Sequence, residues 1–442
     1  MQMSFKPCIK TNDSRANFKG ENMPTAKTFL DIERIRRDFP SISPDSIYLD
    51  SVASSLTPLP VIEAMNEYYM KYRANVHRGA YDLSLQASER FEHAVANIAR
   101  FIGAQPAEIV ITSNATHGLN EVALSLDFEP GDEVLVSSLE HSSNILPWKR
   151  LAKKVGINLQ WYKPSKTGHF DMEKFERLLT PKTRLVALTY VSNVLGSIVP
   201  VEEVAKLCRE RNILYLIDAS QAAPHLPIDV KRIGCDFLVF SGHKMLGPTG
   251  VGILYMKLEH AQTLMPAFLG GGTMNTSACN CTTLEGCSID ECTFSDLPYK
   301  WSAGTPPIAE VLGLSAAVDY LNTIGFEAIV HHDQQSMRRA LAGLMAIPGI
   351  ELFGPVQPEE RSSILSFNIG LLPPSEVGRM LNEQFHIAVR AGDHCAVNYF
   401  RDVQELERPK GNVRASFYLY NTEEEVDRFL AAVEQIAQTC LS

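Results

Sequence analysis

The chain has 442 residues, of which 45% are hydrophobic, 8% aromatic and 21% charged. This balance excludes a disordered polymer, a fibrous repeat and a minimal disulfide scaffold, and the length allows one or two large cores. The formal net charge is -10 and the sequence contains no basic tract, which argues against nucleic acid as a partner.

Neither a membrane span nor a secretion signal is predicted. The longest run without charged residues, Leu264–Leu284, is rich in Gly, Thr, Asn, Ser and Cys and is too polar for a membrane helix. Residues 1–28 lack the apolar stretch of a secretion signal. The nine cysteines, an odd number, indicate free, catalytic or metal-bound thiols in a reducing compartment. We therefore expect a cytoplasmic protein without a membrane partner.

Short β-branched runs alternate with amphipathic stretches from Ile109 onward. The runs are EIVITS, DEVLVSS, RLVALTYV, ILYLIDAS and DFLVFSG. Buried apolar runs separated by helix-length segments indicate parallel strands with crossover helices, so we expect an α/β sheet that is covered on both faces. Ligands of such sheets bind beyond the carboxyl ends of the strands, which makes the residues after each run the candidates for chemistry.

A second, smaller unit is predicted after this sheet. The alternation ends at GVGILYM (Gly250–Met256), a Gly- and Cys-rich stretch follows, and a helix is expected over Pro307–Leu321. Beyond Gly325 the pattern predicts an α+β domain with helices at 327–346, Ser375–Gln384 and Glu423–Gln438 and strands at SSILSFNIG and HIAVR. We divide the chain into an N-terminal segment (1–45), expected to be partly flexible and to pack on the small domain, a large domain (46–324) with a Cys-rich insertion (273–297), and a small domain (325–442).

An acid and a lysine follow neighbouring strands of the predicted sheet. Asp218 comes after ILYLI, and Lys244 ends DFLVFSGHK. A lysine that carries pyridoxal 5′-phosphate (PLP) needs an acidic partner for the pyridine nitrogen, although an isolated pair would more often be a helix cap and a surface lysine. Two loops suit the phosphate of the same cofactor, namely the helix start at 114–120 and the segment around Ser241 and His243.

These residues belong to a series of motifs in a fixed order. The motifs are YLDSVASS, NVHRGAYDLS, SNATHGLN, LEHSSNILPW, YVSNVLGS, IDASQAAPH, FSGHKMLGPTGVGILY, SAGTP, VRAGDHCA and VRASFYLYNTEEEVDR. With them the sequence resembles the class V aminotransferase-like PLP enzymes, specifically the cysteine desulfurase and selenocysteine lyase branch, from about Tyr48 to Arg428. The resemblance implies the fold-type-I architecture of PLP-dependent transferases and a homodimer.

The resemblance also implies a role for each matching residue. Lys244 would carry the cofactor and move the α-proton, His141 would stack on the cofactor ring and assist proton transfer, and Cys395 would be a nucleophile on a short loop. Asp218 would pair with the pyridine nitrogen and Gln221 with the ring hydroxyl. The phosphate would be held by Ala115, Thr116, Ser241, His243 and, from the second subunit, Thr305. The predicted contacts of the substrate are Asn193, which also touches the cofactor, Arg390, Arg414 and His77.

The implied reaction converts L-cysteine to L-alanine and leaves a persulfide on Cys395. The sulfur would pass to an acceptor protein or a small thiol, for iron–sulfur cluster assembly or another thiolation pathway. Two alternatives keep the cofactor, namely a C–S lyase acting on cystine or cysteine and a selenocysteine lyase, and in these Cys395 is partly or wholly dispensable. Three residues depart from the family pattern. Ser142 and Asp393 each stand where a second histidine is usual, and His117 stands where many relatives have glutamate.

A cysteine cluster is the larger departure from the family. Cys279, Cys281, Cys287 and Cys292 are spaced C-x-C-x5-C-x4-C. Four thiolates so close together suit zinc or an iron–sulfur cluster, but the paired C-x2-C signature is missing. Reduced thiols without a ligand, and a relay of sulfur away from Cys395, are the alternatives. A metal- or cluster-binding scaffold would make this segment the functional element, whereas the presence of Lys244 and Asp218 favours an enzyme.

Overall fold

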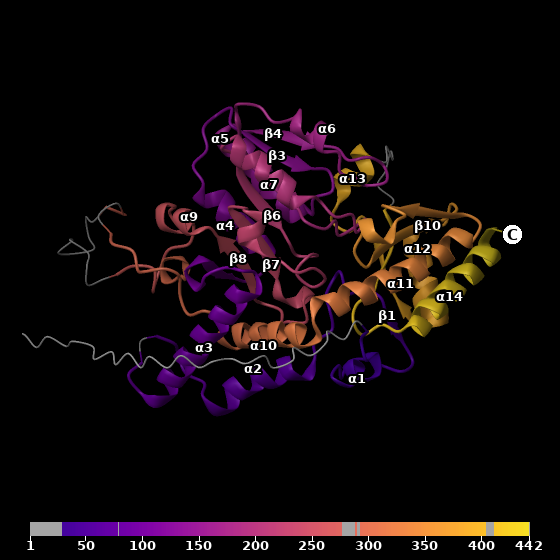
Figure 1. Cartoon of the computed structure of the whole chain (residues 1–442), viewed down its shortest axis with the longest axis horizontal. Coiled ribbons are helices and arrows are strands. Elements are labelled where there is room, and N and C mark those ends of the chain that lie inside the picture. The colour runs from indigo at the N-terminus through magenta and orange to yellow at the C-terminus, as the bar shows by residue number, and fades with distance from the viewer. Residues whose placement is uncertain (1–28, 78, 276–287, 290–291, 404–410, 442) are drawn as a thin grey trace, which may run out of the picture.

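The computed structural model describes residues 29–77, 79–275, 288–289, 292–403 and 411–441. A seven-stranded sheet forms the larger part of the molecule, and a four-stranded antiparallel sheet belongs to the C-terminal third. In Figure 1 the helices α11 (Phe326–Ala346), α12 (Pro374–Phe385) and α14 (Glu423–Leu441), drawn in orange to yellow, gather at one end of the molecule. The predicted α/β fold, with a large mostly parallel sheet and a smaller α+β part, is confirmed.

The described helices and strands have the following bounds. The helices are α1 (Ile32–Arg37), α2 (Leu59–Lys71), α3 (Asp82–Phe101), α4 (Ala115–Ser125), α5 (Leu146–Val155), α6 (Met172–Glu176), α7 (Val201–Glu210), α8 (Val230–Ile233), α9 (Leu258–Thr263), α10 (Ile308–Ile324), α11 (Phe326–Ala346), α12 (Pro374–Phe385), α13 (Val397–Asp402) and α14 (Glu423–Leu441). The strands are β1 (Ile47–Tyr48), β2 (Ile109–Thr112), β3 (Glu133–Ser137), β4 (Asn158–Tyr162), β5 (Thr183–Thr189), β6 (Leu214–Asp218), β7 (Phe237–Ser241), β8 (Gly252–Met256), β9 (Ile350–Phe353), β10 (Ile364–Ile369), β11 (Ile387–Ala388), β12 (Arg390–Gly392) and β13 (Asn412–Ser416).

The large sheet has the order β2-β8-β7-β6-β5-β3-β4. The five strands predicted from the apolar runs, β2, β3, β5, β6 and β7, all run in the same direction. Strands β3, β5, β6 and β7 form parallel pairs. Strand β8 is antiparallel to both β7 and β2, so β2 has the same direction as β7. The reversed strand β8 follows β7 through a short connection that is not long enough for a crossover helix. The edge strand β4 was not predicted, because its sequence NLQWY carries no continuous apolar run.

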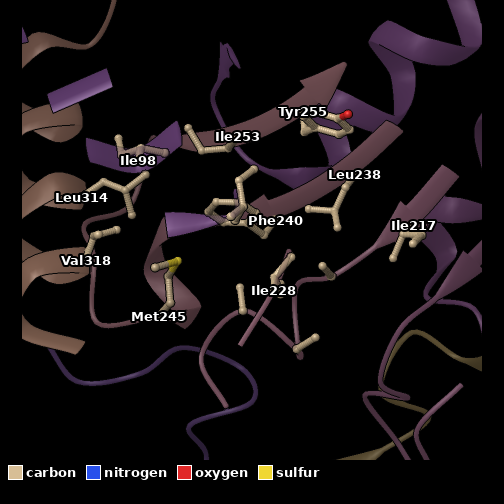
Figure 2. Packing of buried hydrophobic residues seen from close by; sticks show 14 of the residues in the cluster. Ile98, Ile217, Ile228, Leu238, Phe240, Met245, Ile253, Tyr255, Leu314 and Val318 are labelled. Atoms are coloured by element: carbon tan, nitrogen blue, oxygen red, sulfur yellow. The ribbon is translucent and has the colours of Figure 1, made fainter. Parts of the chain in front are cut away.

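Successive residues of the central strands face opposite cores. On β7, Leu238 and Phe240 pack into the core beneath α2, α3, α7 and α10, whereas Phe237 and Val239 pack into the core beneath α4, α5 and α9. Figure 2 shows the first of these cores, with Phe240 between Ile253 of β8 and Met245. Burial on both faces accounts for the continuous apolar runs of the sequence and specifies the pairing register of the strands.

The small sheet has the order β12-β13-β10-β9, and α11, α12 and α14 share its core. The short strand β1 pairs in parallel with β11, and Ile47 and Leu49 are buried in the same core. The division that we expect at residue 46 places β1 in the large domain, whereas the side chains of Ile47 and Leu49 pack in the core of the small sheet.

The helix α1, which precedes β1, also contacts the C-terminal part of the chain. Arg36 of α1 donates to the carbonyl of Tyr420 at 2.7 Å and to Glu425 at 2.8 Å. The expectation for residues 1–28 lies outside the described residues. Of the Cys-rich insertion, the described ends meet in an antiparallel bridge between Met274 and Phe294. Within the described parts of the chain, no helix is long and apolar enough to cross a membrane.

Candidate active site

The carboxyl ends of the parallel strands border one cavity of about 250 Å³. Asp218 is the last residue of β6, Ser241 is the last residue of β7, and Lys244 ends the short 3₁₀ turn that follows. This is the edge at which open α/β sheets bind their ligands. All but two of the residues predicted to bind the cofactor or the substrate line this cavity, and so does the predicted nucleophile Cys395. The predicted residues in the lining are Ala115, Thr116, His141, Asn193, Asp218, Gln221, Ser241, His243, Lys244, Arg390, Cys395 and Arg414.

One end of the cavity is acidic and tightly held. Asp218 is 6% exposed, and its Oδ1 accepts a hydrogen bond from the backbone N–H of Ser220 at 3.0 Å. Gln221 is also buried and donates from Nε2 to the carbonyl of Val52 at 3.0 Å. The other carboxylates of the described chain do not line this cavity. Asp218 is therefore the acid available to a cationic ring nitrogen.

The other end of the cavity is rich in hydrogen-bond donors. Here α4 begins at Ala115, whose N–H donates to Ser241 Oγ at 2.9 Å, and Thr116 Oγ1 lies 2.7 Å from Ser143 Oγ. A helix N-terminus and hydroxyl groups together suit a phosphate. Gly252 of β8 lets this loop approach the sheet, because a Cβ on Gly252 would lie 2.5 Å from Cα of Asn114.

Lys244 and His141 lie between these two ends. Burial lowers the pKa of Lys244, and the nearby Asp218 carboxylate opposes the shift. Burial also lowers the pKa of His141, and the positive charge of Lys244 adds to that effect. Nδ1 of His141 accepts a hydrogen bond from the N–H of Ser143 at 3.2 Å, which assigns the proton of the neutral ring to Nε2. Burial therefore favours the neutral form of both side chains.

The donor set of this cavity fits PLP. The acid needed by the pyridine nitrogen, the lysine that carries the aldehyde and the phosphate-binding helix start all line one cavity. At the phosphate end, the absence of a side chain on Gly252 leaves room for the backbone of Asn114. The residues that would hold the cofactor are therefore Asp218, Gln221, Lys244, Thr116, Ser241 and His243.

Arg414 of β13 brings a guanidinium into the cavity from the small sheet. The side chain is 2% exposed. It donates from Nη1 to the carbonyl of Asn193 at 2.9 Å and from Nη2 to Asp50 Oδ1 at 3.1 Å. Its Nε is buried without a hydrogen-bond partner among the described residues. Burial lowers the pKa of Arg414 to about 10, which leaves the group cationic at neutral pH. A buried cation with a spare donor suits a substrate carboxylate.

Of the three other predicted substrate contacts, Asn193 and Arg390 line the cavity but differ in their surroundings. Asn193 is 8% exposed, but its Nδ2 donates to the carbonyl of His394 at 2.8 Å, so the amide holds the Cys395 loop. Arg390 lies at the start of β12 with an exposed side chain, and its positive charge acts on Lys244, Asp50 and Arg414.

The loop that carries Cys395 has a strained backbone. His394 and Cys395 have φ angles of 51° and 59°, in the left-handed region that costs a non-glycine residue about 1–2 kcal/mol each. Nε2 of His394 lies 2.8 Å from Asn412 Oδ1, and burial lowers the pKa of His394 to about 3, so the ring is neutral. After the loop, α13 docks on the large part of the molecule, where Tyr399 Oη donates to the carbonyl of Lys166 at 3.0 Å.

The two predicted residues that lie outside the cavity are His77 and Thr305. Both line a separate hollow of about 790 Å³, together with Gly271, Gly272 and Tyr299. The ring of His77 lies 4.7 Å from that of Tyr299, and its Nδ1 lies 3.7 Å from a carboxylate oxygen of Glu92. The described chain alone does not bring either residue to Lys244.

Sequence reasoning missed the buried carboxyl of Glu140, directly before His141. Oε1 accepts from Ser137 Oγ at 2.6 Å and Oε2 accepts from Asn144 Nδ2 at 2.7 Å. Burial raises the pKa of Glu140 to about 7, and the nearby charge of Asp218 acts in the same direction. The sequence offered one sign of this residue, because Glu140 is the single acidic residue of LEHSSN.

The predicted metal ligands are only partly described. Cys279, Cys281 and Cys287 lie outside the described residues, and Cys292 has an intermediate exposure. The zinc or iron–sulfur site therefore remains a prediction from the sequence.

Fold and site together define a PLP-dependent enzyme of fold type I. Residues 47–429 match the family model for aminotransferase class V, and the chain belongs to that family. Within the family it is similar to a protein of Streptomyces coelicolor named "probable cysteine desulfurase", with 40% identity over 92% of this chain and 97% of that protein.

Two solved structures agree with this assignment. The apo structure of cysteine desulfurase from Thermococcus onnurineus has a TM-score of 0.85 at 38% identity and covers 92% of this chain and 98% of its own. The cysteine desulfurase CsdA (S-sulfonic acid) from Escherichia coli has a TM-score of 0.82 at 32% identity and covers 93% and 99%. These three relatives all carry the name cysteine desulfurase.

Proposed function

We propose that the protein is a PLP-dependent cysteine desulfurase that converts L-cysteine to L-alanine and collects the substrate's sulfur on Cys395. The observation that carries the proposal is the lining of the 250 Å³ cavity, in which Cys395 joins Lys244, Asp218 and Arg414. A thiol at this place can reach the sulfur of an amino acid bound there, whereas a lyase has no need of it.

Each side chain has one task in this reaction. When bound, the cofactor supplies an electron sink that stabilises negative charge on the substrate's α-carbon. Arg414 orients the substrate through its carboxylate, and the depressed pKa of Lys244 favours the neutral amine that takes the α-proton. His141, with its proton on Nε2, stays neutral and can stack on an aromatic ring.

The sulfur step then requires only Cys395. Its thiolate attacks the substrate sulfur, a sulfur–sulfur bond forms, and the bond between that sulfur and the β-carbon breaks. The electron pair of the broken bond remains with the substrate, whose carbon takes up a proton. L-cysteine and the Cys395 thiol thus give L-alanine and a Cys395 persulfide, with no external oxidant or reductant. A thiol or an acceptor protein would remove the sulfur, and iron–sulfur cluster assembly is one pathway that consumes it.

Product analysis with L-cysteine and dithiothreitol tests this function. Alanine and sulfide should appear in equal amounts, and Cys395→Ala should abolish both. Pyruvate and ammonia as products, surviving Cys395→Ala, would instead identify a C–S lyase. A rate with selenocysteine that survives Cys395→Ala while the rate with cysteine does not would identify a selenocysteine lyase.

We also propose a homodimer. His77 and Thr305 border a hollow that is open to the surface, and the exposed side chains of Tyr81, Leu85 and Phe268 are 55%, 59% and 50% accessible in a single chain. A second copy could cover these apolar groups and bring Thr305 to the phosphate end of its neighbour's cavity. Light scattering of the active enzyme tests this, and a monomeric mass at full activity would contradict it.

The location and the metal are smaller proposals. Cys208, Cys235, Cys395 and Cys440 take part in no disulfide, which suits the cytoplasm. Elemental analysis of protein purified without chelators tests the site predicted from Cys279, Cys281, Cys287 and Cys292. One zinc, or iron with acid-labile sulfide, per protomer would support it, and background amounts would contradict it.

A further inference from the structure

The strained conformation of Cys395 is held from two sides by side chains that the reaction itself does not use. The carbonyl of Cys395 accepts two hydrogen bonds from Ser142, one from its N–H at 2.8 Å and one from its Oγ at 2.9 Å. The N–H of Cys395 donates to Asp393 Oδ1 at 2.9 Å. Both backbone polar groups of the nucleophile are therefore satisfied by residues from different parts of the chain.

Ser142 links the loop to the cofactor end of the cavity. It lies between His141, which lines the cavity, and Ser143, whose Oγ lies 2.9 Å from His141 Nδ1 and 2.7 Å from Thr116 Oγ1. The three consecutive residues 141–143 thus contact the catalytic imidazole, the Cys395 backbone and the phosphate loop. A shift of the Cys395 carbonyl relative to Ser142 would also be a shift relative to the cofactor.

Asp393 acts within the loop itself. Its carboxylate caps the N–H of Cys395, and its own carbonyl accepts from the N–H of Ala396 at 2.8 Å, which closes a tight turn around the nucleophile. Ser142 and Asp393 are the two motif positions at which this sequence departs from the usual histidine. A hydroxyl and a carboxylate are short groups that reach the backbone at these positions, and both contacts converge on the same residue.

We propose that Ser142 and Asp393 are positioning residues that clamp the backbone of Cys395 in its left-handed conformation and thereby hold its thiol over the bound substrate. The proposal rests on the desulfurase function proposed above. The strain of two successive left-handed residues favours a relaxed loop, and the two contacts oppose that relaxation. Loss of either contact should let the thiol leave its place of attack, while the cofactor end of the cavity stays as it is.

Four variants of the holoenzyme test the proposal. Ser142→Ala removes the hydroxyl donor and Ser142→Thr retains it, whereas Asp393→Ala removes the acceptor and Asp393→Asn retains an oxygen at the same place. Asp229→Ala is the matched control, because Asp229 likewise caps backbone N–H groups, those of Lys231 and Arg232, but does not line the cavity.

Two readouts should move in opposite directions. The single-turnover rate of alanine formation should fall about tenfold in each alanine variant, since small displacements of a reacting group are costly. The KM for cysteine should stay within about twofold, because Arg414 is untouched. The rate at which iodoacetamide alkylates Cys395, followed by mass spectrometry, should rise by about threefold as the loop opens. Exposed Cys440 provides the internal reference, and buried Cys208 and Cys235 report a loss of fold.

The conservative variants decide the outcome. Ser142→Thr and Asp393→Asn should restore the rate of alanine formation to within about threefold of wild type and the rate of alkylation to within about 1.5-fold of wild type. Unchanged rates in both alanine variants, or a rise in alkylation that the conservative variants share in full, would overturn the proposal. The alkylation rate does not depend on turnover. If the wild-type enzyme formed pyruvate rather than alanine, the proposed function would fail, and alkylation would still show whether Ser142 and Asp393 clamp Cys395.

Discussion

The two halves of the active site are held in place in different ways. Asp218, Ser241 and Lys244 sit at or just after strand ends in the large sheet, where two buried cores fix the backbone. Cys395 sits on a loop with left-handed φ angles, and this loop is held because Ser142 and Asn193 donate hydrogen bonds to its carbonyls and Asp393 accepts one from the N–H of Cys395. The fold itself positions the cofactor, whereas individual side chains position the nucleophile.

This difference implies that the two halves can be disabled separately. A change at the strand ends should stop every reaction of the bound amino acid. A change in the Cys395 loop should stop only the transfer of sulfur and leave the removal of the α-proton intact. Substitutions in each half can therefore test whether the two halves act independently.

Lys244→Ala should stop both halves of the reaction. We expect alanine formation to fall by about 10³-fold or more, because the proposed reaction assigns removal of the α-proton to Lys244. Exchange of the substrate's α-hydrogen with deuterated water, followed by NMR, should be lost with it. Lys231→Ala, on the surface of α8, is the matched control and should keep both rates. Exchange at the wild-type rate in Lys244→Ala would show that another group removes the proton.

Cys395→Ala should separate the two halves. We expect no alanine and no sulfide from L-cysteine, but α-hydrogen exchange within about threefold of wild type, because the strand-end residues are unchanged. The two rates are measured on the same sample by NMR. Loss of exchange together with desulfuration would mean that the loop and the cofactor end do not act independently.

Arg414→Lys should weaken substrate binding. A lysine cannot reproduce the planar guanidinium, and a hydrogen bond to a charged group contributes about 1.5–3 kcal/mol, so KM should rise about 10- to 100-fold with a smaller change in kcat. Arg379→Lys, an exposed ion-pair substitution on α12, is the control. An unchanged KM in Arg414→Lys, with the thermal midpoint preserved, would remove Arg414 from the substrate site.

Glu140→Gln should change stability as a function of pH. Burial raises the pKa of Glu140 from 4.5 to about 7, so between these values the folded protein holds a proton that the unfolded chain releases. Stability therefore falls as the pH rises through this window, by about 3 kcal/mol in total for this group. Urea unfolding at pH 5 and pH 8 should show a smaller decrease in Glu140→Gln than in wild type. An equal decrease in both would contradict the assignment.

The sequence predicted the large sheet and the cofactor end well, for a physical reason. Strands that are buried on both faces leave continuous apolar runs, and the residues after ILYLI and DFLVFS must then meet at one edge. Asp218, Ser241 and Lys244 lie where this reasoning placed them. The polar edge strand β4 and the pairing of β1 with β11 could not be predicted, because neither has a distinctive pattern and the second joins residues far apart in the chain.

The organisation of the Cys395 loop was also beyond the sequence. Asn193 was predicted to hold the substrate, but its Nδ2 donates to the loop carbonyl of His394. Ser142 and Asp393 appeared only as departures from a motif, because hydrogen bonds between a side chain and a loop backbone leave no periodic signal. Glu140 was missed because its bonds to the side chains of Ser137 and Asn144 likewise leave no periodic signal.

The most direct test of the account is a single turnover of the holoenzyme with L-cysteine in the absence of reductant. Mass spectrometry of the peptide that contains Cys395 should show one added sulfur atom, and one equivalent of alanine should appear per active site. The account predicts that the added sulfur is absent from every other cysteine at the earliest time point. Alanine without sulfur on Cys395, or sulfur first on another cysteine, would contradict the central claim that the clamped thiol is the nucleophile.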